Sequence, residues 1–265
     1  MDPRLTVTRD GAVAEVILNR PDKRNALDMA LFEALIAAGE ALKGAPGLRA
    51  VILHGAGAAF CAGIDTAEFM AMAGRLAAVK AEMLEPPPGQ ANRFQRPCTI
   101  WAELDVPVIA AVHGVCFGAG LQLALGADFR IASPEARFSV MEARWGLIPD
   151  MGITQSLPRL MRADQAKDLI LSARVLAAPE AAALGLVTRL ETDPLAAARA
   201  MAARFAQVSP DVLRAGKRLV EDCWTLPPGP GLRREAELQA GLIGGANQIE
   251  AVMAGMAGRA PRFPD

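Results

Sequence analysis

Two nearly continuous apolar segments constrain the fold of this chain more than any other feature. They are RAVILH at residues 49–54 and VPVIAAV at residues 106–112, and such runs are typical of parallel strands that are buried on both faces. A helical pattern from Asp28 to about Lys43 precedes the first segment, and two more, at about 66–83 and 91–104, precede the second. Strands that alternate with helices in this way predict an α/β fold.

The order of the other elements divides the chain into two parts. Further strands are predicted at residues 5–8, 12–18, 128–132 and 137–139. Only helical patterns follow Gly152, at about 153–160, 163–172, 178–184, 194–207, 209–224 and 231–257. We therefore predict an α/β core over residues 1–190 and a helical segment over residues 191–265. The proline-rich run at residues 85–89, within the segment 66–95, is the candidate for a mobile lid or an insertion.

The composition argues against several classes of protein. With 28 basic and 29 acidic residues the net charge is −1, so there is no basic excess that would favour nucleic acid or a membrane surface. We see no secretory signal, and no apolar run approaches the roughly 18 residues that would indicate a membrane span. The four cysteines lack C-x-x-C spacing and there are only two histidines, so we expect reduced buried thiols, no metal site and a cytoplasmic location.

Two loops have the composition of a site that binds negative charge. AAFCAGID at residues 58–65 and GVCFGAG at residues 114–120 each leave a predicted strand and enter a helix. Backbone N–H groups at such a helix start have no partner within the helix, and two of them facing one point would form an oxyanion hole. Ordinary tight turns are one alternative. Dinucleotide binding is another, although Phe60 stands where the third glycine of G-x-G-x-x-G would fall after Gly55 and Gly57.

Four segments together resemble one enzyme family. LNRPDKRNAL at 18–27, AFCAGID at 59–65, AAVHGVCFGAGLQLALGADFRIAS at 110–133 and FSVMEARWGLIPDMG at 138–152 occur in the order typical of the enoyl-CoA hydratase/isomerase (crotonase) family. The resemblance covers residues 5 to about 225. It implies a spiral of β-β-α turns, with residues 191–265 as a helical trimerisation region in a homotrimer or a dimer of trimers. It also implies an acyl-CoA substrate. No cofactor is expected, because coenzyme A is part of that substrate.

The same resemblance assigns residues to the site. The backbone N–H groups of Ile64 and Ala119 would hold the thioester oxygen. Hydrogen bonds to this oxygen acidify the neighbouring carbon and stabilise an enolate. A carboxylate must then move a proton. Residues that would line the coenzyme A or the substrate are Lys23, Arg24, Ala26, Ala62, Gly63, Asp65, Thr66 and Gly118. For Lys23 and Arg24, a charge that is simply solvated is the alternative.

The catalytic residues depart from the hydratase pattern at one position. Hydratases of this family carry two glutamates, and the corresponding residues here are Gln122 and Glu142. A glutamine can orient water but cannot take up or deliver a proton near neutral pH. Asp150, eight residues after Glu142, resembles an acid of the dienoyl-CoA isomerases, although these carry a third acid where this chain has Gln122. We therefore expect isomerisation rather than hydration.

Several alternatives to this assignment stay open at the level of sequence. The protein could be a hydratase with a weakened site, a non-catalytic acyl-CoA-binding protein or, least in keeping with the motifs, a nicotinamide-dependent dehydrogenase. Asp150 could cap the helix that follows it, and Gln122 could be a structural helix residue. We expect His113 to make packing or hydrogen-bonding contacts, and Trp145 to lie in the core or in a pocket wall.

Overall fold

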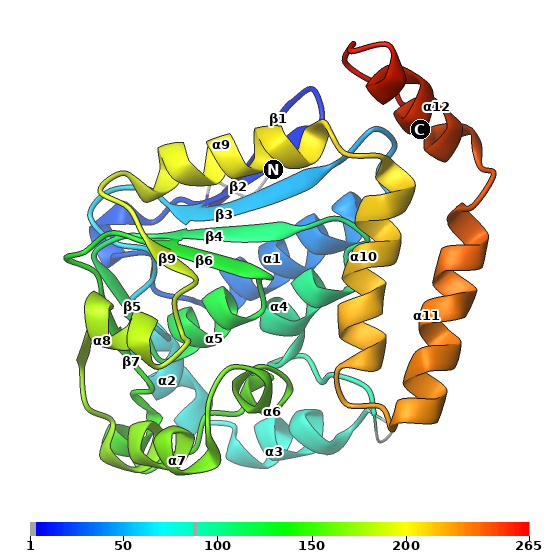
Figure 1. The fold of residues 1–265 in the computed structure, drawn as a ribbon. Coiled ribbons are helices and arrows are strands. Elements are labelled where there is room, and N and C mark those ends of the chain that lie inside the picture. Colours follow the sequence, from blue (N-terminus) through cyan, green and yellow to red (C-terminus); the bar gives the residue numbers. More distant parts are fainter. Residues whose placement is uncertain (1–3, 87–88, 265) are drawn as a thin grey trace.

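A six-stranded sheet lies at the centre of the molecule (Figure 1). The computed structural model describes residues 4–86 and 89–264. Within the sheet β1 is antiparallel to β2, and every other neighbouring pair is parallel. The strand order is β1 (Leu5–Asp10), β2 (Val13–Leu18), β3 (Ala50–Gly55), β4 (Val108–Val112), β6 (Phe129–Ala132) and β9 (Arg189–Leu190). The prediction of an α/β fold is confirmed.

Helices cover both faces of this sheet. Alternate side chains of a strand point to opposite faces, so in β3 Ala50 and Ile52 pack in one apolar cluster while Val51 and Leu53 pack in another. The first cluster lies under α9 (Pro194–Ala206), and helices on the other face include α1 (Met29–Leu42), α4 (Arg96–Thr99) and α5 (Ala119–Leu125) (Figure 1). The first helix after residue 190 therefore packs on the core.

A second, smaller sheet was not expected from the sequence. It joins β5 (Val115–Phe117), β7 (Arg137–Ser139) and β8 (Leu176–Ala177), and β5 lies inside the second glycine-rich loop. The prediction that only helices follow Gly152 is wrong, because β8 and β9 lie beyond it. Both strands have two residues, which is too short for an alternating pattern to be visible in the sequence.

Three predicted helices are interrupted or shortened. The helix at 66–83 is divided into α2 (Thr66–Ala73) and α3 (Leu76–Leu84), and the one at 231–257 into α11 (Pro228–Leu242) and α12 (Ala246–Met256). Gly244 has φ +79°, a left-handed conformation that ends a helix and that glycine adopts readily. The helix at 91–104 is reduced to α4 and the 3₁₀ turn Ile100–Glu103. Of the proposed lid, Pro87 and Pro88 lie outside the described residues.

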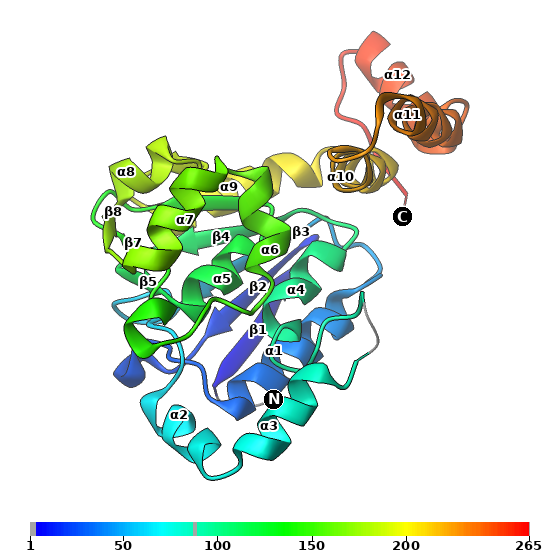
Figure 2. The same cartoon turned by 90° about the horizontal axis from the view of Figure 1, so that it is seen from below.

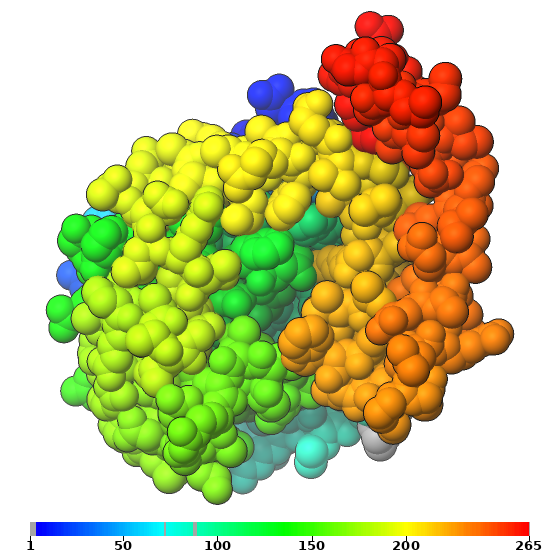
Figure 3. Space-filling view, in the orientation of Figure 1, coloured from blue at the N-terminus to red at the C-terminus, as the bar shows by residue number. Residues whose placement is uncertain are grey.

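The C-terminal helices extend away from the sheet. Between β7 and α9 the chain forms α6 (Ile153–Ser156), α7 (Ala163–Ser172) and α8 (Ala178–Ala183). Next, α10 (Pro210–Cys223) runs past the edge of the core, and α11 and α12 project beyond it (Figures 1 and 2). The surface is hollowed between α10 and the yellow-green part of the core that contains α7 and α8 (Figure 3). None of the described helices is long and apolar enough to span a membrane.

Candidate functional site

The two glycine-rich loops meet beyond the ends of β3 and β4. Cys61 and Cys116 form a parallel bridge, in which the N–H of Phe117 donates to the carbonyl oxygen of Cys61 at 3.0 Å. The N–H of Cys61 in turn donates to the carbonyl oxygen of Val115 at 3.1 Å. Both thiols are buried, as predicted, and burial raises the pKa of Cys61 to about 12, so it is an inert space-filling group. The loops are therefore held to one another by backbone hydrogen bonds.

The peptide N–H of Ile64 is left unoccupied by the way its neighbours are held. The N–H of Leu27 donates to the carbonyl oxygen of Gly63 at 2.7 Å, and the N–H of Asp65 donates to the carbonyl oxygen of Leu27 at 2.8 Å. Gly63 has φ +104°, a conformation that favours glycine. Across residues 4–86 and 89–264, the N–H of Ile64 has no hydrogen-bond acceptor. This is one of the two donors predicted from the sequence.

The second predicted donor, Ala119, lies directly beside the first loop. It is the first residue of α5, and the preceding Gly118 has φ +50° and donates its own N–H to the carbonyl oxygen of Ser139 at 2.9 Å. The N–H of Ala119 likewise has no acceptor in the described part of the chain. A Cβ built on Gly63 would lie 4.0 Å from the nitrogen of Ala119. The two free N–H groups thus lie on adjoining backbone segments.

Glu142 and Gln122 are brought together beside these donors. Glu142 begins the 3₁₀ turn Glu142–Trp145, and its Oε1 would be 3.5 Å from a Cβ built on Gly118. The side chain of Gln122, on α5, is 3% exposed and donates through Nε2 to Oε1 of Glu142 at 2.7 Å. Oε1 of Gln122 accepts a hydrogen bond from the N–H of Met151 at 2.8 Å. Sequence reasoning missed the part played by Met151, because a backbone N–H leaves no trace in residue identity.

Burial changes the acidity of both predicted acids. Loss of hydration raises the pKa of Glu142; the nearby charge of Asp150 raises it further, whereas the N–H of Gln122 lowers it. Oε2 of Glu142 is buried and has no hydrogen-bond partner among the described residues. Asp150 is exposed, but partial loss of hydration raises its pKa as well. The N-cap of α6 is Gly152, so the alternative that Asp150 caps this helix is wrong.

The residues predicted to line coenzyme A fall into two groups. Lys23 and Arg24, in the N-terminal segment, and Thr66, the first residue of α2, are exposed. The carboxylate of Asp65 is instead engaged within the protein, because it accepts from Arg20 at 2.9 Å and from the N–H of Ala67 at 3.0 Å.

Further hydrogen bonds and an ion pair connect residues 20–28 with each other and with the first loop. The carbonyl oxygen of Arg24 accepts the N–H of Ala62 at 2.9 Å, and that of Ala26 accepts from Arg20. Arg20 also lies 3.3 Å from the carboxylate of Asp28. The motif LNRP at residues 18–21 contained the signal for Arg20, but its buried partners could not be read from the sequence.

Aromatic side chains border the turn that carries Glu142. The rings of Phe69, on α2, and Trp145 have centroids 6.2 Å apart. Trp145 was predicted to lie in the core or in a pocket wall; at 61% exposure it does not lie in the core. His113 hydrogen-bonds to the carbonyl oxygen of Gly57 at 2.9 Å, which confirms its predicted structural contact.

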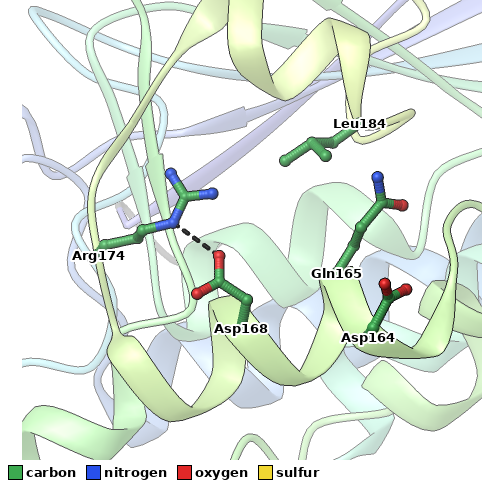
Figure 4. A pocket seen from close by; sticks show the side chains of 5 residues that line it. All are labelled: Asp164, Gln165, Asp168, Arg174 and Leu184. Atoms are coloured by element: carbon green, nitrogen blue, oxygen red, sulfur yellow. Dashed lines mark hydrogen bonds and ion pairs between the residues drawn. The ribbon is translucent and has the colours of Figure 1, made fainter.

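The cavity in Figure 4 lies elsewhere. It has a volume of about 190 Å³ and is lined by Asp164, Gln165, Asp168, Arg174 and Leu184. The first three lie on α7, whereas Arg174 follows α7 and Leu184 follows α8. Arg174 faces Asp168 across it, with Nε 2.9 Å from Oδ2. This charged depression is formed by a part of the chain that carries no predicted site residue.

The close approach of the two loops predicts the effect of replacing Gly120 with alanine. A Cβ on Gly120 would lie 2.5 Å from the carbonyl oxygen of Cys61, so the loop that carries Ile64 must shift. We expect the free energy of unfolding to fall by about 1–3 kcal/mol, as for other overpacked cores. Urea unfolding would measure it. The matched control is Gly216→Ala in α10, where nothing lies within 4 Å of the added methyl group, and where no loss of stability is expected.

Comparisons with known proteins show what this chain is similar to. The sequence model described as enoyl-CoA hydratase/isomerase matches residues 8–243. A Mycobacterium bovis protein named "Probable enoyl-CoA hydratase echA8" is 32% identical over 98% of this chain and 97% of its own length. The mouse mitochondrial Delta(3,5)-Delta(2,4)-dienoyl-CoA isomerase is 35% identical over 77% of this chain and 64% of its own length. The crystal structure of an enoyl-CoA hydratase from Bacillus anthracis superimposes with a TM-score of 0.88 at 30% identity, covering 98% of each chain.

Proposed function

This chain belongs to the enoyl-CoA hydratase/isomerase family of acyl-CoA enzymes, and we propose that it moves double bonds within an unsaturated acyl-CoA rather than adding water. One observation carries the choice of reaction. Gln122 occupies the position of the first of the two hydratase glutamates. Its amide already makes two hydrogen bonds, one to Glu142 and one from the N–H of Met151. The second proton-transfer group available near Glu142 is the carboxyl of Asp150.

The first step of the proposed reaction uses the backbone. The free N–H groups of Ile64 and Ala119 hold the thioester oxygen, where negative charge develops as the α-carbon loses a proton. Each donor of this kind contributes roughly 3–4 kcal/mol to transition-state stabilisation in enzymes where one has been removed. These two N–H groups need little rearrangement when the substrate binds, because hydrogen bonds to Leu27 and Ser139 already hold the neighbouring peptides in place.

The two carboxyl groups then divide the proton transfers. Glu142 takes the proton from the α-carbon of a 3,5-dienoyl-CoA, and the electron pair spreads over the conjugated chain as a dienolate. Asp150, in its acid form, delivers a proton to the far end of the conjugated system, which gives the 2,4-dienoyl-CoA. The sum is an isomerisation, with no atom gained or lost. Burial raises the pKa of both groups, and this moves them in the direction that favours proton exchange by a general acid or base.

The remaining parts of the proposal concern binding. Coenzyme A enters and leaves with the substrate, and the chemistry described needs neither a metal nor another cofactor. We propose that Lys23 and Arg24, which are both exposed, bind its phosphates.

We also propose a homotrimer or a dimer of trimers, because apolar side chains remain exposed on the projecting helices and at their junction. These are Val220, Trp224, Leu232, Ile243, Ile249, Val252, Met253 and Met256.

An absorbance assay with two substrates tests the choice of reaction. The purified protein should convert a 3,5-dienoyl-CoA to the 2,4-isomer, seen as new conjugated absorbance, and should hydrate crotonyl-CoA slowly. Rapid loss of crotonyl-CoA absorbance without dienoyl-CoA isomerisation would contradict the proposal. It would support the second candidate, a hydratase, which is favoured by the relatives of that name that match 98% of the chain.

A further inference from the structure

The side-chain amide of Gln122 joins three separate elements at the site. It extends from α5, donates to Glu142 at the start of the 3₁₀ turn, and accepts from Met151 in the segment before α6. At 3% exposure it is shielded from water, so these two hydrogen bonds have little competition from solvent. The residue therefore acts on the geometry of both acids without being able to transfer a proton.

Only one orientation of this amide is compatible with its neighbours. An ionised carboxylate offers acceptors alone, and the N–H of Met151 offers a donor alone. Turning the amide over would place oxygen against the oxygen of Glu142 and NH₂ against the N–H of Met151. Both contacts would then be lost in a buried place, so the amide is fixed with its NH₂ group toward Glu142.

The two oxygens of Glu142 consequently differ. Oε1 is held by Gln122 at 2.7 Å, whereas Oε2 is buried and has no partner in the described residues. We propose that Gln122 is a positioning residue that anchors Oε1, leaves Oε2 as the oxygen that takes the substrate proton, and sets the distance from Glu142 to Asp150. The inference rests on the proposed function, in which Glu142 is the base.

The link to Asp150 runs through the backbone. Met151 follows Asp150 directly, so the hydrogen bond from its N–H to Gln122 restrains the peptide that carries the second acid. A glutamate at position 122 could still accept from Met151, but it would face Glu142 with a second carboxylate. The two groups would then have to share a proton or separate. In this chain the amide allows Glu142 to be ionised and anchored at the same time.

Substituting Gln122 with methionine tests the proposal. The variant Gln122→Met keeps the length and loses both hydrogen bonds. We expect kcat with a 3,5-dienoyl-CoA to fall about 10–100-fold, as for other small misplacements of a catalytic group, while KM stays within about threefold of the wild-type value. The acidic limb of the pH profile of kcat/KM should move to higher pH, because the N–H that lowers the pKa of Glu142 is gone.

A second variant and two controls keep the test decisive. Gln122→Glu is nearly isosteric, retains the acceptor for Met151, and should shift the acidic limb in the same direction even if Gln122→Met unfolds. Gln155→Met, at an exposed glutamine on α6, should leave the profile unchanged. An unchanged kcat and acidic limb in folded Gln122 variants would overturn the inference, and so would a rise in KM alone. Wild-type turnover in Glu142→Gln would instead overturn the proposed function.

Discussion

Replacing Glu142 with glutamine should lower kcat for dienoyl-CoA isomerisation by about 10²–10⁴-fold, the usual contribution of a positioned acid or base. Glutamine has nearly the shape of glutamate but cannot take a proton near neutral pH. Its side-chain oxygen can still accept from Nε2 of Gln122, so the contact at 2.7 Å is preserved. The loss is therefore expected in the chemical step, with KM little changed.

Steady-state kinetics at several pH values would measure this effect. The matched control is Glu135→Gln, an exposed glutamate in the loop before β7, which should retain wild-type kinetics. Solvent deuterium exchange at the α-carbon gives a second reading, because it reports proton removal even when isomerisation is incomplete. A Glu142→Gln protein that kept more than a tenth of wild-type turnover would show that another group is the base.

The second large effect is expected where α10 is anchored to the core. Replacing Lys217 with methionine should lower the free energy of unfolding by about 3–5 kcal/mol at pH 7. Nζ of Lys217 lies 2.9 Å from Oδ2 of Asp128 and 3.1 Å from the carbonyl oxygen of Val106. The two charged side chains are only 8% and 17% exposed. Without the ammonium group, Asp128 must stay buried as an unpaired anion or take up a proton.

The size of this loss should depend on pH. Burial already raises the pKa of Asp128, and the charge of Lys217 opposes that rise, so removing Lys217 raises the pKa further. When the pKa of a carboxyl group is higher in the folded than in the unfolded protein, the free energy of unfolding falls as the pH rises toward the pKa of the folded state. The deficit of Lys217→Met should therefore shrink from pH 7 to pH 5, by at most about 1.4 kcal/mol per pH unit.

Urea unfolding at the two pH values separates this mechanism from a general loss of packing. Lys167→Met, at an exposed lysine on α7, should change stability by less than about 0.5 kcal/mol. Adding Asp128→Asn to Lys217→Met replaces the buried carboxylate with a neutral amide, and should recover part of the stability and abolish the pH dependence. A deficit that is the same at pH 5 and pH 7 would contradict the account given for Asp128.

Much of the site could be predicted because its components are local in sequence. The loops with Ile64 and Ala119 are recognisable from glycines and small residues that follow buried strands, and Glu142 falls in a segment with a characteristic order of residues. The neighbours of these residues could not be predicted. Asp65 was assigned to substrate binding, but its carboxylate is paired with Arg20, 45 residues away in the chain.

The errors in the fold have a similar origin. The strands β8 and β9 have two residues each, and they form only because β7 and β6 offer them hydrogen-bonding partners. The break between α11 and α12 at Gly244 is a local event, and the glycine was visible in the sequence. An apolar pattern alone did not reveal it, since the pattern continues across the break.

The sequence by itself determined the α/β class, the order of the apolar strands and the loops that lead to the free N–H groups. It did so because the periodicity of apolar residues and the conformational freedom of glycine act over a few residues. The tertiary structure decided how Gln122, Glu142 and Met151 meet. Residue identity shows that Gln122 is no acid, but only the three-dimensional arrangement shows that its amide holds one oxygen of Glu142 and leaves the other free. Such contacts join residues 20 and 29 positions apart, where local patterns carry no information.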